Sequence, residues 1–197
     1  MIKISESIDK VQNIQKILIG ITGASGMLFL DSFLRTISSA DLIIHGICSA
    51  SGRMVLNTEL DLLPEKLPVV EKWFDIGDMA APAASGSSDY EAMVILPCTM
   101  GSLAAIAGGL SINLIHRAAD VMLKERKKLV LAVRETPLNR NHLQNMLTVH
   151  DAGGIICPVM PSYYLKPKNL EEAAQSYSWR LADQLGVEIE GRRRWKC

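Results

Sequence analysis

The chain has 197 residues, and its 21 Lys and Arg side chains balance its 21 Asp and Glu side chains, so its formal net charge at pH 7 is zero. This balance excludes a global basic field that would hold nucleic acid or a membrane surface, and any anion binding must be local. A domain usually holds roughly 100 to 200 residues, so we expect a short N-terminal extension, residues 1–15, and a single domain, residues 16–197.

Composition and residue spacing exclude further classes of protein. No run approaches the roughly 18 apolar residues that a membrane span needs, and the N-terminal residues show no secretory signal. We therefore expect a soluble, cytoplasmic protein. Neither the cysteines nor the histidines have the spacing of metal ligands or of a disulfide framework, so we expect reduced thiols, structural histidines and no metal. These residues are Cys48, Cys98, Cys157, Cys197, His45, His116, His142 and His150.

Apolar runs alternate with helical patterns along the chain, which is typical of βαβ units that form a parallel sheet. The predicted strands are residues 16–22, 41–48, 92–98, 128–133 and 153–160. The predicted helices are residues 26–39, 52–60, 101–110, 112–127, 139–150 and 169–185. The strand runs are almost continuously apolar, as expected where helices cover both faces of a sheet. The fold class is therefore α/β, a three-layer, doubly wound parallel sheet.

Polar residues follow each predicted strand, at the edge where open α/β sheets bind ligands. They are TGASG (22–26), SASG (49–52), TMGS (99–102), RETPL (134–138) and PSYY (161–164). TGASG is either a tight turn without a ligand or a site where backbone N–H groups meet an anion. It is too short for a dinucleotide fingerprint, and no acid before Glu59 is placed to hold a ribose, so a mononucleotide fits better than NAD.

Charged and aromatic residues further along the chain each have two interpretations. On a helix, Arg117, Asp120 and Lys124 share one face, which is either a solvated surface or part of a site; Lys127 and Lys128 are assigned to the solvated surface. Arg134 and Glu135 either pair or cap the next helix, or they act as a phosphate clamp and an acid/base. Tyr164 is either a half-buried packing residue or part of the site, and Arg180 is either a surface charge or part of the site. The loop of residues 78–89 is either a linker or a mobile flap.

Five stretches in this order resemble the UbiX-type flavin prenyltransferases, formerly described as phenylacrylic-acid or hydroxyarylic-acid decarboxylase subunits. They are TGASG, SGSS (85–88), PCTMGSL (97–103), NLIHRAADVMLKERKKLVLAVRETPL (113–138) and PSYY. The resemblance extends from residue 16 to Trp195, and the long block is highly specific. One departure is Met79, which stands where many members carry a Trp before SGSS.

The resemblance implies a flavodoxin-like or Rossmann-like fold, assembled as a homododecamer. It implies that a dimethylallyl group from dimethylallyl phosphate is joined to N5 and C6 of reduced FMN, without a metal. The product, prenylated FMN, would serve as the cofactor of a separate UbiD-type decarboxylase. Two alternatives stay open: an FMN-dependent aromatic-acid decarboxylase, and a non-catalytic FMN-binding subunit of one.

The resemblance also assigns roles to residues by their position. It implies that FMN is bound by Gly23, Ala24, Ser25, Ser49, Thr99, Met100, Gly101, Ser102 and Arg134. It implies that the prenyl phosphate is bound by Tyr164, Arg180, Lys124 and Arg134, with Arg117 and Glu59 near the site. The catalytic candidates are Glu135 and Ser25, for proton transfer, and Lys124, for neutralising the departing phosphate.

Overall fold

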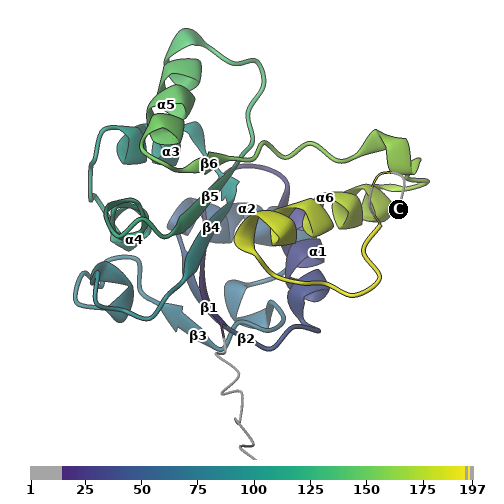
Figure 1. Ribbon diagram of the computed structural model, residues 1–197, viewed down its shortest axis with the longest axis horizontal. Helices are drawn as coiled ribbons and strands as arrows, with labels where there is room; N and C mark the ends of the chain where they lie inside the picture. Colours follow the sequence, from purple (N-terminus) through teal and green to yellow (C-terminus); the bar gives the residue numbers. More distant parts are fainter. Residues whose placement is uncertain (1–14, 194, 196–197) are drawn as a thin grey trace, which may run out of the picture.

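The computed structural model describes residues 15–193 and residue 195 (Figure 1). Apart from Gln15, which begins the first strand, the predicted N-terminal extension lies outside the described residues, as does Cys197. No helix in the described part of the chain is long and apolar enough to cross a membrane.

Six parallel strands form one sheet, in the order β3-β2-β1-β4-β5-β6. They are β1 (Gln15–Ile21), β2 (Leu42–Cys48), β3 (Lys72–Phe74), β4 (Ala92–Cys98), β5 (Lys128–Val133) and β6 (Ile155–Ile156). The first four predicted strands are confirmed within one residue at either end. The fifth is reduced to β6, because the chain leaves the regular ladder at Pro158, which has no N–H to donate. The prediction missed β3, which is too short to show an apolar run.

Six helices connect the strands and match the six predicted helices with small shifts at their ends. They are α1 (Met27–Ile37), α2 (Ala50–Leu60), α3 (Met100–Ala107), α4 (Leu114–Lys124), α5 (Arg140–Asp151) and α6 (Leu170–Leu185), with short 3-10 turns η1 (Pro64–Lys66), η2 (Pro82–Ala84) and η3 (Tyr163–Leu165). Five helices begin at a Ser, Thr or Asn whose side chain accepts a hydrogen bond from the first turn, which fixes where they start.

Helices cover both faces of the sheet, which confirms the three-layer prediction (Figure 1). Successive residues of β1 alternate between the layers: Ile17 and Ile19 belong to the core under α1 and α6, and Leu18 to the core under α3 and α4. This alternation follows from the two-residue period of a strand. Within the first layer, α1 and α6 pack side by side.

The strand order identifies where the sheet changes direction. The order 3-2-1-4-5-6 is the Rossmann order, and without the short β3 the five remaining strands have the flavodoxin order, so both predicted likenesses hold. Strands β2 and β3 are added on one side of β1, and strands β4 to β6 on the other side, so the strand order reverses between β1 and β4. In such sheets, ligands bind beyond the carboxyl ends of the strands at this switch point.

The loop of residues 78–89 packs into the domain. Ala83 is fully buried, and the backbone carbonyl of Ala84 accepts a hydrogen bond from Nε of Arg117 on α4 (3.0 Å). Because it belongs to the core under α4, the loop is not a linker between domains. Its role as a mobile flap stays a prediction.

Candidate functional site

Three loops meet at the switch point between β1 and β4. The side chain of Thr22, directly after β1, donates a hydrogen bond to the carbonyl of Pro97 (2.7 Å) and accepts one from the N–H of Thr99 (2.9 Å). At Gly23, an added Cβ would lie 2.5 Å from the Cβ of Ser51, in the first turn of α2. Gly23 is therefore required by the close approach of the loop after β1 to the start of α2.

Predicted FMN-binding hydroxyls cap two helices at this edge. Ser49 Oγ accepts a hydrogen bond from the N–H of Gly52 (2.9 Å) at the start of α2, and Thr99 Oγ1 accepts one from the N–H of Ser102 (3.1 Å) at the start of α3. Gly101 is exposed on the first turn of α3. Two positive helix ends thus face the same edge of the sheet, an arrangement that fits the phosphate of a mononucleotide.

A carboxylate of the chain itself covers the N-terminus of α1. Glu59, near the end of α2, accepts hydrogen bonds from the N–H groups of Met27 (2.8 Å) and Gly26 (3.0 Å). Burial, the largest single effect, raises the pKa of Glu59, but hydrogen bonds from the Ser25 hydroxyl and these N–H groups, together with the charge of Arg134, lower it below its usual value. Glu59 is therefore held ionised beside Ser25. Because its carboxylate occupies the N-terminus of α1, the helix ends open to a substrate phosphate are those of α2 and α3.

A cavity of about 590 Å³ opens beside Ser25, at the ends of β5 and β6. We call it the first cavity. Its polar wall contains Ser25, Arg134, Glu135 and Thr136. Its apolar wall consists of Phe29, Met100, Val133, Leu138, Met146, Pro158, Val159 and Met160. Except for Met100, the sequence did not identify these apolar residues, because an apolar side chain facing a ligand has the same residue type as one facing the core.

Arg134 and Glu135 lie on the wall of the first cavity and do not take the structural roles that the sequence left open. Arg134 is half-buried, and its N–H donates to the carbonyl of Cys98 (3.2 Å). Glu135 is exposed and accepts a hydrogen bond from the N–H of Thr136 (2.9 Å). Within the described residues no ion pair joins Arg134 to Glu135, and Asn139 caps the next helix. Both side chains are therefore available to a ligand.

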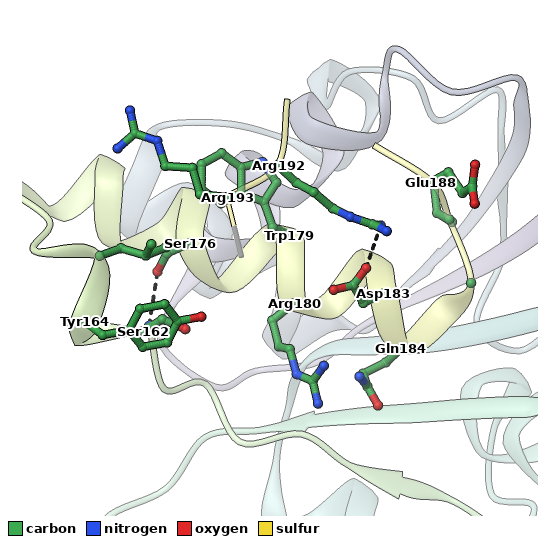
Figure 2. A pocket seen from close by; sticks show the side chains of 13 residues that line it. Ser162, Tyr164, Ser176, Trp179, Arg180, Asp183, Gln184, Glu188, Arg192 and Arg193 are labelled. Carbon is green, nitrogen blue, oxygen red and sulfur yellow. Dashed lines mark hydrogen bonds and ion pairs between the residues drawn. The ribbon is translucent and has the colours of Figure 1, made fainter. Parts of the chain in front are cut away.

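Tyr164 and Arg180 line a second cavity of about 700 Å³, formed by η3, α6 and the C-terminal residues (Figure 2). Arg192 pairs there with Asp183 (2.6 Å). The ring of Tyr164 meets that of Trp195 edge-on, with centroids 5.0 Å apart. The two cavities share no lining residue.

Arg117 and Lys124 form a third group, on α4. Nε of Arg117 donates to the carbonyl of Ala84, and Nη1 pairs with Asp120 (2.7 Å). Lys124 is the last residue of α4 and pairs with Glu125, shortly before β5 begins. Because β5 starts nearby, Lys124 lies toward the amino edge of the sheet, whereas Arg134 and Glu135 follow the carboxyl end of the same strand. One chain does not bring the predicted phosphate clamp together.

The serine loop, residues 85–88, lies against Lys124. Ser85 and Ser87 share a hydrogen bond (2.9 Å). The hydroxyl of Ser88 is buried without a hydrogen-bond partner in the described part of the chain. Hydroxyls beside Lys and Arg side chains suit a phosphate. The sequence contained this signal in SGSS, but we assigned no residue of the loop to the site.

No histidine or cysteine among the described residues lines the first or the second cavity. Nδ1 of His45 lies 2.6 Å from the hydroxyl of buried Tyr90, and His142 forms a capping box with Asn139 at the start of α5. Burial raises the pKa of the Cys98 thiol to about 12, so the thiol stays protonated and unreactive at neutral pH. The described residues contain no cluster of three or more His, Cys, Asp or Glu that would hold a metal.

Comparisons with known proteins agree with this geometry. A family model described as Flavoprotein matches residues 5–176. A relative from Methanothermobacter thermautotrophicus, named flavin prenyltransferase UbiX, is 43% identical over 183 residues, which are 92% of this chain and 96% of the relative.

Two solved structures share the fold over nearly the whole chain. A UbiX in complex with FMN and dimethylallyl pyrophosphate superposes with a TM-score of 0.90 and 36% identity, over 93% of this chain and 98% of that one. A dodecameric FMN-dependent UbiX-like decarboxylase from Escherichia coli O157:H7 has a TM-score of 0.88 and 32% identity, over 93% of this chain and 100% of the other.

Proposed function

Because this chain belongs to the flavoprotein family and, within it, to the UbiX-type flavin prenyltransferases, we propose how its own residues perform flavin prenylation. The enzyme transfers a dimethylallyl group from dimethylallyl phosphate to N5 and C6 of reduced FMN and releases phosphate and prenylated FMN. The observation that carries the proposal is the first cavity, where apolar walls meet Ser25, Arg134 and Glu135 beyond the carboxyl ends of the strands, beside the switch point of the sheet.

The residues at the switch point fit FMN. The capped N-termini of α2 and α3 suit its phosphate, and the absence of a side chain at Gly23 lets the loop after β1 pack against the first turn of α2. The apolar walls suit the flavin ring and a C5 prenyl group. Reduced FMN bound there would supply two nucleophilic atoms, N5 and C6. N5 would lose its proton as it bonds to the dimethylallyl group and phosphate leaves. Bonding at C6 would need a proton added to the remaining C=C double bond, and C6 would then lose its own proton, so the second step takes up one proton and releases one.

Glu135 and Glu59 take different parts in handling these protons. Glu59 accepts hydrogen bonds from two backbone N–H groups and from Ser25, which holds it ionised and fixes the direction of the Ser25 hydroxyl. Glu135 is exposed on the cavity wall. We assign Glu135 as the group that accepts a proton, and Ser25 as a hydrogen-bonding group oriented by Glu59.

The departing phosphate needs cations that one chain keeps in three places. Arg134 lines the first cavity, Tyr164 and Arg180 the second, and Lys124 and Arg117 lie on α4. We propose that copies in a homo-oligomer place α4 and its serine loop of one copy against a cavity of another. The dodecameric state named for the Escherichia coli relative supports this. In a dry site each charge-stabilising contact contributes roughly 3 kcal/mol.

The product and the thiols suggest where the enzyme acts. Prenylated FMN serves another enzyme as a cofactor, and we propose that a UbiD-type decarboxylase receives it. We also propose a cytoplasmic location, where a reducing environment keeps thiols such as Cys48, Cys98 and Cys157 free.

The direct test is mass spectrometry of the flavin after anaerobic incubation of the purified protein with reduced FMN and dimethylallyl phosphate. We expect a flavin heavier by one C5 prenyl unit. A parallel sample with oxidised FMN serves as the control and should stay unmodified. Bound but unchanged reduced FMN would contradict the proposal and would favour a flavin-binding subunit or a direct decarboxylase.

A further inference from the structure

We infer that Ser176 and Tyr177, two neighbours on α6, position the two halves of the active site by holding the segment of residues 157–162, which we call the bridging segment. The inference rests on the proposed function, because it takes the first cavity as the flavin site and the second as the site of prenyl phosphate groups. Its physical basis is a pair of hydrogen bonds that join two buried residues of α6 to the two ends of this segment.

The bridging segment connects the two cavities. Pro158, Val159 and Met160 line the first cavity, whereas Ser162 and, two residues later, Tyr164 line the second. On its sheet side, the segment is fixed by the N–H of Val159, which donates to the carbonyl of Val133 (3.0 Å). Its position therefore affects the shape of both cavities.

Tyr177 fixes the end of the bridging segment at the first cavity. Its side chain is 1% exposed, and its hydroxyl donates a hydrogen bond to the carbonyl of Cys157 (2.8 Å). Its ring meets Phe29 edge-on, with centroids 5.6 Å apart. Phe29 lies on α1 and lines the first cavity from another side. One buried side chain thus sets the separation of two walls around the flavin.

Ser176 fixes the other end. It is 4% exposed, and its hydroxyl accepts a hydrogen bond from the N–H of Ser162 (3.1 Å) while donating one to the carbonyl of Ala173 (2.7 Å). Ser176 also lines the second cavity, but its hydroxyl is already engaged on both sides. Its effect on a ligand is therefore exerted through Ser162 and Tyr164 (Figure 2).

The chain supplies a matched control for each residue. Ser178, also buried on α6, donates to the carbonyl of Ala174 (2.8 Å), and its Oγ lies 3.0 Å from Oγ of Ser32 on α1, away from the bridging segment. Tyr90 is likewise 1% exposed and hydrogen-bonded, but its partner is His45 in the opposite core layer. Removing either hydroxyl deletes a buried hydrogen bond without releasing the bridging segment.

The experiment compares Tyr177→Phe with Tyr90→Phe, and Ser176→Ala with Ser178→Ala, in the full-length assembled protein. FMN affinity is measured by flavin fluorescence, the KM of dimethylallyl phosphate by prenyl transfer, and stability by thermal unfolding. Tyr177→Phe should weaken FMN binding about fivefold, because a freed carbonyl leaves the cavity wall unfixed. Ser176→Ala should raise the KM of dimethylallyl phosphate by a similar factor and leave FMN affinity unchanged.

The control variants should lower the unfolding temperature by similar amounts and leave both constants unchanged. Equal shifts of both constants in all four variants would overturn the inference, as would FMN affinity of the wild-type value in Tyr177→Phe. If the wild-type protein made no prenylated FMN, the proposed function would fail. The FMN measurement would still decide the role of Tyr177, and protection from thermal unfolding by dimethylallyl phosphate would decide that of Ser176.

Discussion

At the scale of single residues, two carboxylates near the first cavity have different surroundings. Glu59 caps α1 and receives the Ser25 hydroxyl, whereas Glu135 stands exposed after β5 with a hydrogen bond from the N–H of Thr136. A carboxylate held ionised by several donors is a poor proton acceptor during a reaction. This contrast separates the orienting role of Glu59 from the proton-transfer role of Glu135.

Glu135→Gln tests the proton-transfer role. Since the amide has nearly the same shape but cannot accept the proton, prenyl transfer should slow about 100-fold while FMN affinity stays within about twofold of the wild type. Single-turnover formation of prenylated FMN measures the step. Glu91→Gln, at the start of β4, is the control and should be fully active. Full activity in Glu135→Gln would remove this residue from the mechanism.

Glu59→Gln tests the ionised cap on α1. Because the pKa of Glu59 is lowered in the folded protein, its stabilising effect is fully present above the ordinary carboxyl pKa and is lost as the pH falls through the folded value. The variant should be less stable than the wild type by roughly 0.3–1 kcal/mol at pH 7. Chemical denaturation between about pH 3 and pH 7 should show this difference shrink as the pH falls below the usual glutamate pKa of about 4.3. A difference independent of pH would exclude the ionised cap.

At the scale of elements, the basic run after α4 connects segments of the fold. Nζ of Lys127 donates to the carbonyl of Ser88 (2.8 Å), and Nζ of Lys128 donates to the carbonyl of Leu185 at the end of α6 (3.2 Å). Lys128 is exposed, as the prediction of a solvated surface has it, and Lys127 is half-buried. Their ammonium groups satisfy backbone carbonyls between elements, which a pattern of charges along one helix does not show.

Gly23→Ala tests the contact between the loop after β1 and the first turn of α2. The added methyl would overlap the side chain of Ser51, so the loop and the helix must separate and FMN affinity should fall about tenfold or more. Equilibrium binding of FMN measures the loss. The second substitution Ser51→Gly removes the overlapping atoms and should restore most of the affinity. Wild-type affinity in Gly23→Ala alone would show that the close approach does not shape the flavin site.

At the scale of the whole molecule, the phosphate-binding groups are divided between the carboxyl edge, the C-terminal cavity and the amino end of β5. Arg134, Arg180 and Lys124 represent these places. Symmetric assembly repeats every surface, so groups that are separate in one chain can meet across an interface. The site proposed here is therefore a property of the assembly.

Mixed assemblies test this division. Lys124→Ala and Glu135→Gln should each be nearly inactive alone. If each site takes these two residues from different copies, random mixing of the two co-expressed chains should restore roughly a quarter of the sites, namely those in which both contributing residues are unchanged. Prenyl transfer per bound FMN measures the recovery. The double variant, with both changes in one chain, is the control and should stay inactive. No recovery in the mixed assembly would mean that both residues serve the same chain's cavity.

The sequence by itself determined four long strands, six helices and the edge where the ligand binds, because periodicity and capping residues act over a few neighbouring positions. It also placed Ser25, Arg134 and Glu135 after strands that end at one edge, and the structure puts all three on one cavity wall. The family resemblance, carried by whole motifs, is confirmed by relatives of known name.

Only the tertiary structure decided which partners these residues meet. Glu59 reaches α1 from the end of α2, Tyr177 reaches Cys157 from α6, and Lys128 reaches Leu185, although each pair lies far apart in the sequence. It also separated Lys124 from Arg134, which stand on either side of β5 and so at its opposite ends. The reason is physical: residue type sets what a side chain can donate or accept, but packing sets which distant group lies within its reach.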